Sequence, residues 1–239
     1  MARFAARKLL ACISLLWVLP AAALDPDREF FQYVLGWPPQ HINLPSEVLD
    51  VQEDEEGFLW LATSRGLMKY DGIEATSFRV LEYPNVLSNS PTALFIDSSN
   101  RLFISSERGT AIYDGGMFQT LLSGNTRTTQ ARAFAEGPDA AIWIGTEEGL
   151  WLYDGSRIDL VDLDPLPDHI QSLLWHGDKL YIGSRGQLFV MDGNSLSTLE
   201  LPEQFARAHV RDLEFHQGHI WGATRSGLFR IEENVAVAI

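Results

Sequence analysis

Four arginines lie beside turn glycines in a repeated pattern, and together they could bind an anion. They are Arg65, Arg108, Arg185 and Arg225. A guanidinium group binds a carboxylate or a sulfate through two parallel hydrogen bonds. The pattern predicts a site for an acidic small molecule, for example an oligosaccharide that carries such groups. The other interpretation is that these are solvated turn residues, which is the usual role of surface charges.

Other reactive side chains do not form a recognisable centre. His216 and His219 have a spacing typical of metal ligands, but they flank the turn at 217–218 and no third ligand follows at a suitable distance. The acidic run 54–56 is a candidate for weak cation binding only. Nucleophile elbows and phosphate-binding glycine loops are missing from the sequence. The sequence therefore predicts no catalytic residue, no metal site and no cofactor.

The arginines belong to a pattern that recurs five times, at intervals of about 40 residues. Each repeat has one large aromatic residue followed by a turn glycine. The aromatic residues are Trp60, Phe103, Trp143, Tyr181 and Trp221, and the glycines are Gly66, Gly109, Gly149, Gly186 and Gly227. Two markers that recur in step indicate five copies of one structural unit.

Each unit has the pattern of four short β-strands. In the first unit the strands are expected at 48–52, 58–63, 67–70 and 73–78. Asp71-Gly72 would form a type I′ hairpin turn, because both of its central residues tolerate positive φ. Four antiparallel strands in about 40 residues make one blade of a β-propeller. The sequence predicts an all-β propeller of five four-stranded blades, at about 44–80, 87–120, 128–162, 167–200 and 207–239.

The first 23 residues have the pattern of a secretory signal peptide. Arg3, Arg7 and Lys8 precede an apolar run at 9–19, and a small-residue cleavage pattern ends near Ala23. An uncleaved anchor fits less well, because the run is shorter than the roughly 20 residues that span a bilayer. The only cysteine, Cys12, lies in this leader. We therefore expect a periplasmic protein whose mature chain has no cysteine.

The charge of the chain argues against some partners. It has 18 Lys and Arg against 32 Asp and Glu, a formal net charge of −14, and loss of the leader makes this three units more negative. Such a surface repels nucleic acid and anionic membranes. We expect no nucleic-acid partner.

Residues 57–72 and 142–155 resemble the two-component-regulator propeller repeat, through GFLWLATSRGLMKYDG and IWIGTEEGLWLYDG. The resemblance implies the periplasmic sensor region of a hybrid histidine kinase or a membrane diguanylate cyclase. It also implies a small-molecule ligand and a membrane signalling partner or further domains on the C-terminal side. No kinase or cyclase signature is present in the sequence, so no enzymatic activity is expected of this chain. The alternatives are a propeller enzyme acting on polysaccharide and a protein-binding scaffold.

Propellers of that family usually have about seven blades, so five leave two arrangements open. The chain forms either a small closed ring or an incomplete part of a larger, seven-bladed ring. The segment 24–43 could close the ring through a strand at 29–34. Trp37, in the same segment, is expected either to stack on a sugar or to anchor that strand. Asp50, Ser172 and Asp212 lie on the innermost strands, where they either line a central channel or relieve crowding.

Overall fold

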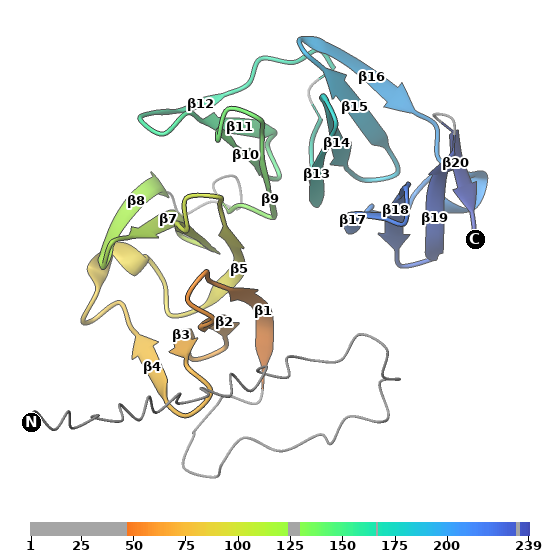
Figure 1. Cartoon of the computed structure of the whole chain (residues 1–239). Coiled ribbons are helices and arrows are strands. Elements are labelled where there is room, and N and C mark those ends of the chain that lie inside the picture. The colour runs from red at the N-terminus through yellow and green to blue at the C-terminus, as the bar shows by residue number, and fades with distance from the viewer. Residues whose placement is uncertain (1–46, 124–129, 166, 233–234) are drawn as a thin grey trace, which may run out of the picture. The chain divides into compact units, whose positions relative to one another are not determined.

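The computed structural model describes residues 47–123, 130–165, 167–232 and 235–239. These residues form five four-stranded antiparallel sheets, and in every sheet each strand pairs with the next one along the chain (Figure 1). We call the sheets blades 1 to 5 in chain order. The predicted all-β fold with five four-stranded blades is confirmed. Among the described residues, no helix is long and apolar enough to cross a membrane.

The strands are short, and the described residues include two single-turn 3₁₀ helices in the connections between blades. Blade 1 has β1 (Val48–Glu53), β2 (Leu59–Thr63), β3 (Gly66–Tyr70) and β4 (Ala75–Phe78). Blade 2 has β5 (Pro91–Ile96), β6 (Leu102–Ser106), β7 (Gly109–Asp114) and β8 (Met117–Ser123). Blade 3 has β9 (Ala133–Glu136), β10 (Ile142–Gly145), β11 (Leu150–Tyr153) and β12 (Ile158–Leu160).

The last two blades follow the same order. Blade 4 has β13 (Ser172–His176), β14 (Lys179–Gly183), β15 (Leu188–Asp192) and β16 (Ser195–Leu199). Blade 5 has β17 (Asp212–His216), β18 (His219–Thr224), β19 (Gly227–Glu232) and β20 (Val235–Ala238). The 3₁₀ helices are η2 (Pro84–Val86) and η3 (Glu203–Phe205).

The core lies between successive blades, because alternate residues of a strand point to opposite faces. In blade 1, Trp60 and Leu67 pack against Leu94 and Leu102 of blade 2. Three more buried clusters join blades 2 and 3, 3 and 4, and 4 and 5 in the same way. A single blade would leave these side chains in water, so each blade depends on its neighbour for its core.

The Asp-Gly turns follow the type I′ prediction only in part. In blade 2 the two-residue loop between Asp114 and Met117 has positive φ at both Gly115 and Gly116, as type I′ requires. In blade 1 the loop spans 71–74, and only Gly72 has positive φ, at 92°. The Asp71 carboxylate instead accepts hydrogen bonds from the backbone N–H groups of Ile73 and Glu74, at 2.7 and 2.6 Å. These hydrogen bonds favour the loop at 71–74 over a two-residue turn, because the Asp71 carboxylate accepts N–H groups in place of a backbone carbonyl.

Several predictions fall outside the described residues. The signal peptide at 1–23, the segment 24–43 with its proposed strand at 29–34, and Trp37 all lie there. Blade 5 already has four strands of its own, β17 to β20.

Candidate functional site

The equivalent turns between the second and third strands hold the predicted arginines, with Arg65 and Arg108 at the second turn position and Arg185 and Arg225 at the first. In blade 1 the Thr63 hydroxyl donates to the carbonyl of Gly66 at 2.7 Å and accepts the backbone N–H of Arg65 at 3.2 Å. The equivalent hydroxyl donates in the same way in blades 2, 3 and 5, from Ser106, Thr146 and Thr224. The turns are therefore compact, and the side chains at their tips are exposed, namely Arg65, Arg108, Arg185 and Arg225.

The segment that connects two blades runs beside this turn. The backbone N–H of Gly186 donates to Ala208 at 2.7 Å, and that of Val210 donates to Ser184 at 3.0 Å. Arg185 and His209 are thereby paired in antiparallel fashion. The turn and the connection between blades 4 and 5 therefore lie side by side, and we call this edge of the blades the rim.

His169 has an equivalent place at the preceding junction, where one of the two backbone hydrogen bonds corresponds and the other differs. Its backbone N–H donates to Glu147 at 3.0 Å, and the N–H of the next residue, Ile170, donates to Thr146 at 3.0 Å. His169 and His209 each precede a fully buried aliphatic residue, Ile170 and Val210. Both imidazoles are therefore held on the rim by backbone pairing.

Positive charge gathers on the rim of blades 4 and 5. Burial lowers the pKa of His209, and the nearby charges of Arg185, Arg211, His169 and Arg225 lower it further. Its Nδ1 atom is buried and has no hydrogen-bond partner within the described part of the chain. We call these five residues the basic rim. Its three arginines, Arg185, Arg211 and Arg225, carry positive charge on a chain whose net charge is −14.

The rim differs in the other blades. In blade 3, Glu147 and Glu148 occupy the turn, and Glu147 forms an ion pair with Arg132 at 2.6 Å. Arg65 and Arg108 lie at the tips of the turns of blades 1 and 2. Of the four predicted arginines, Arg185 pairs with His209, and the charges of Arg185 and Arg225 contribute to lowering the pKa of that imidazole.

Three members of the basic rim were not singled out from the sequence as binding residues: His169, His209 and Arg211. A signal for them does exist, because both histidines occupy the same position relative to the start of an inner strand, about 40 residues apart. Arg211 follows the second of them by two positions. Alignment of the connections, in addition to the strands, would have found them.

The three predicted channel residues lie at equivalent positions near the start of inner strands. Asp50, Ser172 and Asp212 pair with Ala62, Gly183 and Ala223 of the second strands. Asp50 accepts the backbone N–H of Leu94 in the next blade at 2.7 Å. The Ser172 hydroxyl donates to the carbonyl of Val210, also in the next blade, at 3.0 Å.

Asp50 therefore joins two inner strands, and Ser172 joins β13 to the connection just before β17. Asp212 is exposed and accepts only the N–H of the adjacent Leu213, at 3.0 Å, among the residues described. A channel ligand at these positions stays a prediction.

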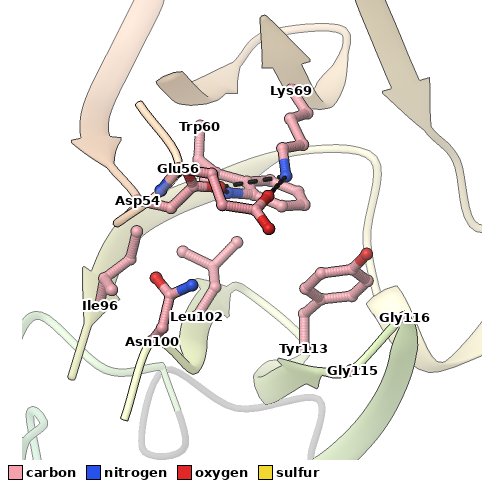
Figure 2. Close-up of a pocket in the computed structure, with 10 residues that line it drawn as sticks. All are labelled: Asp54, Glu56, Trp60, Lys69, Ile96, Asn100, Leu102, Tyr113, Gly115 and Gly116. Carbon is pink, nitrogen blue, oxygen red and sulfur yellow. Dashed lines mark hydrogen bonds and ion pairs between the residues drawn. The ribbon is translucent and has the colours of Figure 1, made fainter. Parts of the chain in front are cut away.

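A cavity of about 190 Å³ lies between blades 1 and 2 (Figure 2). Lys69 contacts the carboxylates of Asp54 and Glu56 there, at 3.1 and 3.6 Å. Asp54 also accepts the indole N–H of Trp60 at 2.9 Å and the backbone N–H of Phe58 at 2.9 Å. Its carboxylate is thus already engaged by one cation and several donors, which argues against the weak cation site considered at 54–56.

Metal-binding side chains do not gather elsewhere in the described ranges, where no cluster of three or more His, Cys, Asp or Glu residues could hold an ion. His216 and His219 face each other as the terminal pair of the β17–β18 hairpin. Phe215, next to His216, stacks on His176 of blade 4 with ring centroids 3.8 Å apart.

Comparison with known proteins identifies solved structures with the same fold. No family model matches the sequence, and no curated protein matches it. The extracellular domain of the hybrid two-component system BT4673 from B. thetaiotaomicron is similar with a TM-score of 0.69 and 22% identity, over 82% of this chain and 28% of that one. The corresponding domain of BT3049 from the same organism gives 0.66 and 20%, over 82% and 31%.

Enzymes share the architecture as well. Virginiamycin B lyase from Staphylococcus aureus is similar with a TM-score of 0.65 and 11% identity, over 81% of this chain and 69% of that one. The chain spans less than a third of the length of the two B. thetaiotaomicron domains. Because the sequence identities are low, these similarities establish the propeller fold alone. The expected resemblance to extracellular sensor propellers is confirmed for the fold.

Proposed function

We propose that this chain is an exported input propeller of a bacterial signal-transduction system, and that it binds an anionic ligand on its basic rim. The ligand class is a small molecule with carboxylate or sulfate groups, such as an acidic oligosaccharide. The observation that carries the proposal is the pairing of Arg185 with His209, together with the hydrogen bond from the N–H of Arg211 to Ala223, two residues before Arg225, on an otherwise acidic chain. The fold shared with extracellular domains of two-component systems supports the role of an input domain.

The geometry suits a multidentate anion better than a single small ion. The three arginines come from a turn of blade 4, the start of β17 and a turn of blade 5. None of them forms an ion pair with another described residue. An anion that contacts both turns would link two blades, and a ligand that bridges structural elements can shift the balance between their arrangements. A shift in the arrangement of blades 4 and 5 is the change through which a signalling partner would sense the bound anion.

Calorimetry and thermal unfolding of the purified chain test this proposal. A sulfated oligosaccharide is compared with a neutral one of the same length. We expect the sulfated ligand to bind and to raise the melting temperature, because a ligand that binds only the folded state stabilises it. The double variant Arg185→Gln, Arg225→Gln should bind at least about tenfold more weakly, since each lost charged hydrogen bond costs about 1.5–3 kcal/mol.

Arg157→Gln is the matched control, because Arg157 is an exposed arginine on the β11–β12 turn, away from the basic rim. Equal binding of the two oligosaccharides, or unchanged binding by the double variant, would contradict the proposed site. Release of shortened or unsaturated sugar products, followed by mass spectrometry, would instead identify the chain as an enzyme.

A further inference from the structure

Each inner strand has, at or just before its start, one residue at an equivalent place beside the second strand. In blade 3 the backbone N–H of Arg132 donates to the carbonyl of Gly145 at 2.8 Å, and in blade 5 that of Arg211 donates to Ala223 at 2.8 Å. Gly145 and Ala223 also pair with the next residue of the inner strand, so the two arginines correspond. We call this place the entry position, and in blades 1 to 5 it is held by Leu49, Thr92, Arg132, Gln171 and Arg211.

The first residue of the turn between the second and third strands lies near the entry position of the same blade. It follows a Thr or Ser in every blade, and we call it the turn position. In blades 1 to 5 it is held by Ser64, Glu107, Glu147, Arg185 and Arg225. Blade 3 shows that side chains at the two positions can meet, because Nη2 of Arg132 lies 2.6 Å from Oε1 of Glu147.

Blade 5 is the blade that has arginine at both positions, Arg211 and Arg225. Both side chains are exposed, and neither forms an ion pair with a residue in the described part of the chain. Both residues belong to the same sheet and its own turn, so their placement does not depend on a neighbouring blade. Compared with blade 3, a guanidinium group thus stands where the carboxylate of Glu147 neutralises its partner.

A carboxylate is the group that this arrangement suits. Two guanidinium groups at these positions repel each other, and an anion between them replaces the repulsion with two attractions. A carboxylate has two oxygens that accept hydrogen bonds in the planar geometry of the guanidinium donors. The ion pair of Arg132 with Glu147 is an example of this contact on the same backbone framework.

We propose that a carboxylate of the ligand binds between Arg211 and Arg225, at the place that the carboxylate of Glu147 takes beside Arg132 in blade 3. This inference rests on the anion-binding role proposed above for the basic rim, and it names the group that is bound and the two side chains that bind it. The ligand class is an oligosaccharide that contains a sugar acid. Arg185, which pairs with His209, is then available to a second acidic group of the same ligand.

Calorimetry of the full chain tests this site with an oligosaccharide of glucuronate and with the same oligosaccharide after reduction of its carboxyl groups to alcohols. The parent chain should bind the acidic form alone. Arg225→Glu places a carboxylate at the turn position, as in blade 3, so that Arg211 is neutralised within the chain. We expect this variant to bind the acidic form at least about tenfold more weakly.

Arg79→Glu is the matched control, because it makes the same change of charge at an exposed arginine just after β4 of blade 1. Salt at physiological concentration screens charges that lie farther than about 8 Å from a ligand, so its affinity should change by less than about threefold. Arg225 and Arg79 are both exposed, so both variants are expected to fold, and circular dichroism checks this.

The reverse substitution tests the equivalence of the two blades. Glu147→Arg gives blade 3 an arginine at both positions, and equilibrium dialysis should then find two glucuronate oligosaccharides per chain instead of one. If circular dichroism shows that this variant does not fold, the result with Arg225→Glu decides the proposal by itself.

The outcomes separate this inference from the proposed function. If Arg185→Gln weakens binding of the acidic form and Arg225→Glu does not, the carboxylate site is wrong although the basic rim still binds an anion. Binding of the sulfated oligosaccharide but not of the glucuronate one would also refute the carboxylate site alone. Equal binding of the acidic and reduced forms would refute both proposals. One bound oligosaccharide per folded Glu147→Arg chain would show that blade 3 is not a valid template for blade 5, and would overturn the inference.

Discussion

The carboxylate of Asp50 accepts the backbone N–H of Leu94 at 2.7 Å, across the junction of blades 1 and 2. The same carboxylate accepts the N–H of Val51 at 2.8 Å. Two inner strands that belong to different sheets, and share no ladder, are thus joined by one side chain. Inner strands lie close together in a propeller, and here a single acidic residue satisfies a backbone donor that the sheet cannot reach.

Asp50→Asn should flatten the dependence of stability on pH. Burial raises the pKa of Asp50 and outweighs the lowering effect of the hydrogen bonds from Leu94 and Val51. The folded chain then holds this proton more tightly than the unfolded chain. Its contribution to stability is full below the unfolded pKa of about 3.9 and is lost as the pH rises through the raised folded pKa.

Urea unfolding of the variant from about pH 3.5 upwards measures this effect. The loss of stability with rising pH should be smaller in Asp50→Asn than in the parent chain. The variant keeps a side-chain oxygen that can accept the N–H of Leu94. Asp212→Asn is the control, since Asp212 is the equivalent residue without a bond to another blade in the described structure. Parallel pH profiles for the parent chain and Asp50→Asn would contradict the prediction.

Asp54→Ala should destabilise blade 1 by about 1–3 kcal/mol, because it leaves buried donors without an acceptor. The carboxylate accepts from the backbone of Phe58 and the indole of Trp60, and it contacts the ammonium group of Lys69. Chemical denaturation followed by tryptophan fluorescence gives the free energy of unfolding. Asp71→Ala, which removes an exposed turn carboxylate with two backbone bonds, should cost less.

The lowered pKa of Asp54 also predicts how the free energy of unfolding changes at acidic pH. Burial by itself raises its pKa, but the hydrogen bonds from Phe58, Lys69 and Trp60 prevail and hold it below the usual value. The stabilisation is therefore present above the unfolded pKa of about 3.9 and is lost as the pH falls through the lowered folded pKa. Asp54→Ala should lose less stability than the parent chain over that range, and an equal loss would show that other carboxylates dominate.

Gly186→Ala should be more damaging than Gly193→Ala, although both glycines have positive φ, at 69° and 56°. A Cβ atom at Gly186 would lie 2.3 Å from the carbonyl oxygen of Ala206, whereas at Gly193 nothing lies within 4 Å. We expect backbone strain in Gly193→Ala to lower the free energy of unfolding by about 1–2 kcal/mol, and we expect a larger decrease for Gly186→Ala. Equal denaturation midpoints would mean that the connection at 206–208 can move away at little cost.

Sulfate binding at the basic rim should strengthen as the pH falls. The pKa of His209 is lowered by burial and then by the surrounding positive charges. It therefore becomes a cation only at a pH below the usual value of about 6.5, where it adds to the charge that holds the anion. In calorimetry, the gain in affinity on acidification should be reduced in His209→Asn and kept in His176→Asn, whose imidazole lies against Phe215 instead.

The unliganded chain should show the opposite trend in stability. Because the folded state holds the His209 proton less tightly than the unfolded state, this contribution to stability is lost as the pH falls from about 6.5 through the lowered pKa. A bound anion offsets that loss. Binding that is independent of pH would place the ligand away from His209.

The periodic features of the sequence were sufficient to predict the strands. The recurrence of residues such as Trp60 and Gly66 gave the correct number of blades and strands, because these residues fill repeated local roles. The Asp-Gly turn of blade 1 was assigned the wrong type, since the capping bonds that Asp71 makes depend on loop geometry. Of the arginine set, only Arg185 and Arg225 share the surroundings of His209.

The sequence alone determined the all-β repeat architecture, since the alternation of apolar and polar residues and the spacing of turns act over a few residues. Only the tertiary structure decided which polar groups meet. Arg185 comes next to His209, and Asp50 next to Leu94, because packed blades bring together residues from separate sheets and connections. The same packing decided that Leu228 and Val51 are exposed while their counterparts in the other blades are buried. Burial depends on a neighbouring blade, and a repeat pattern does not contain that information.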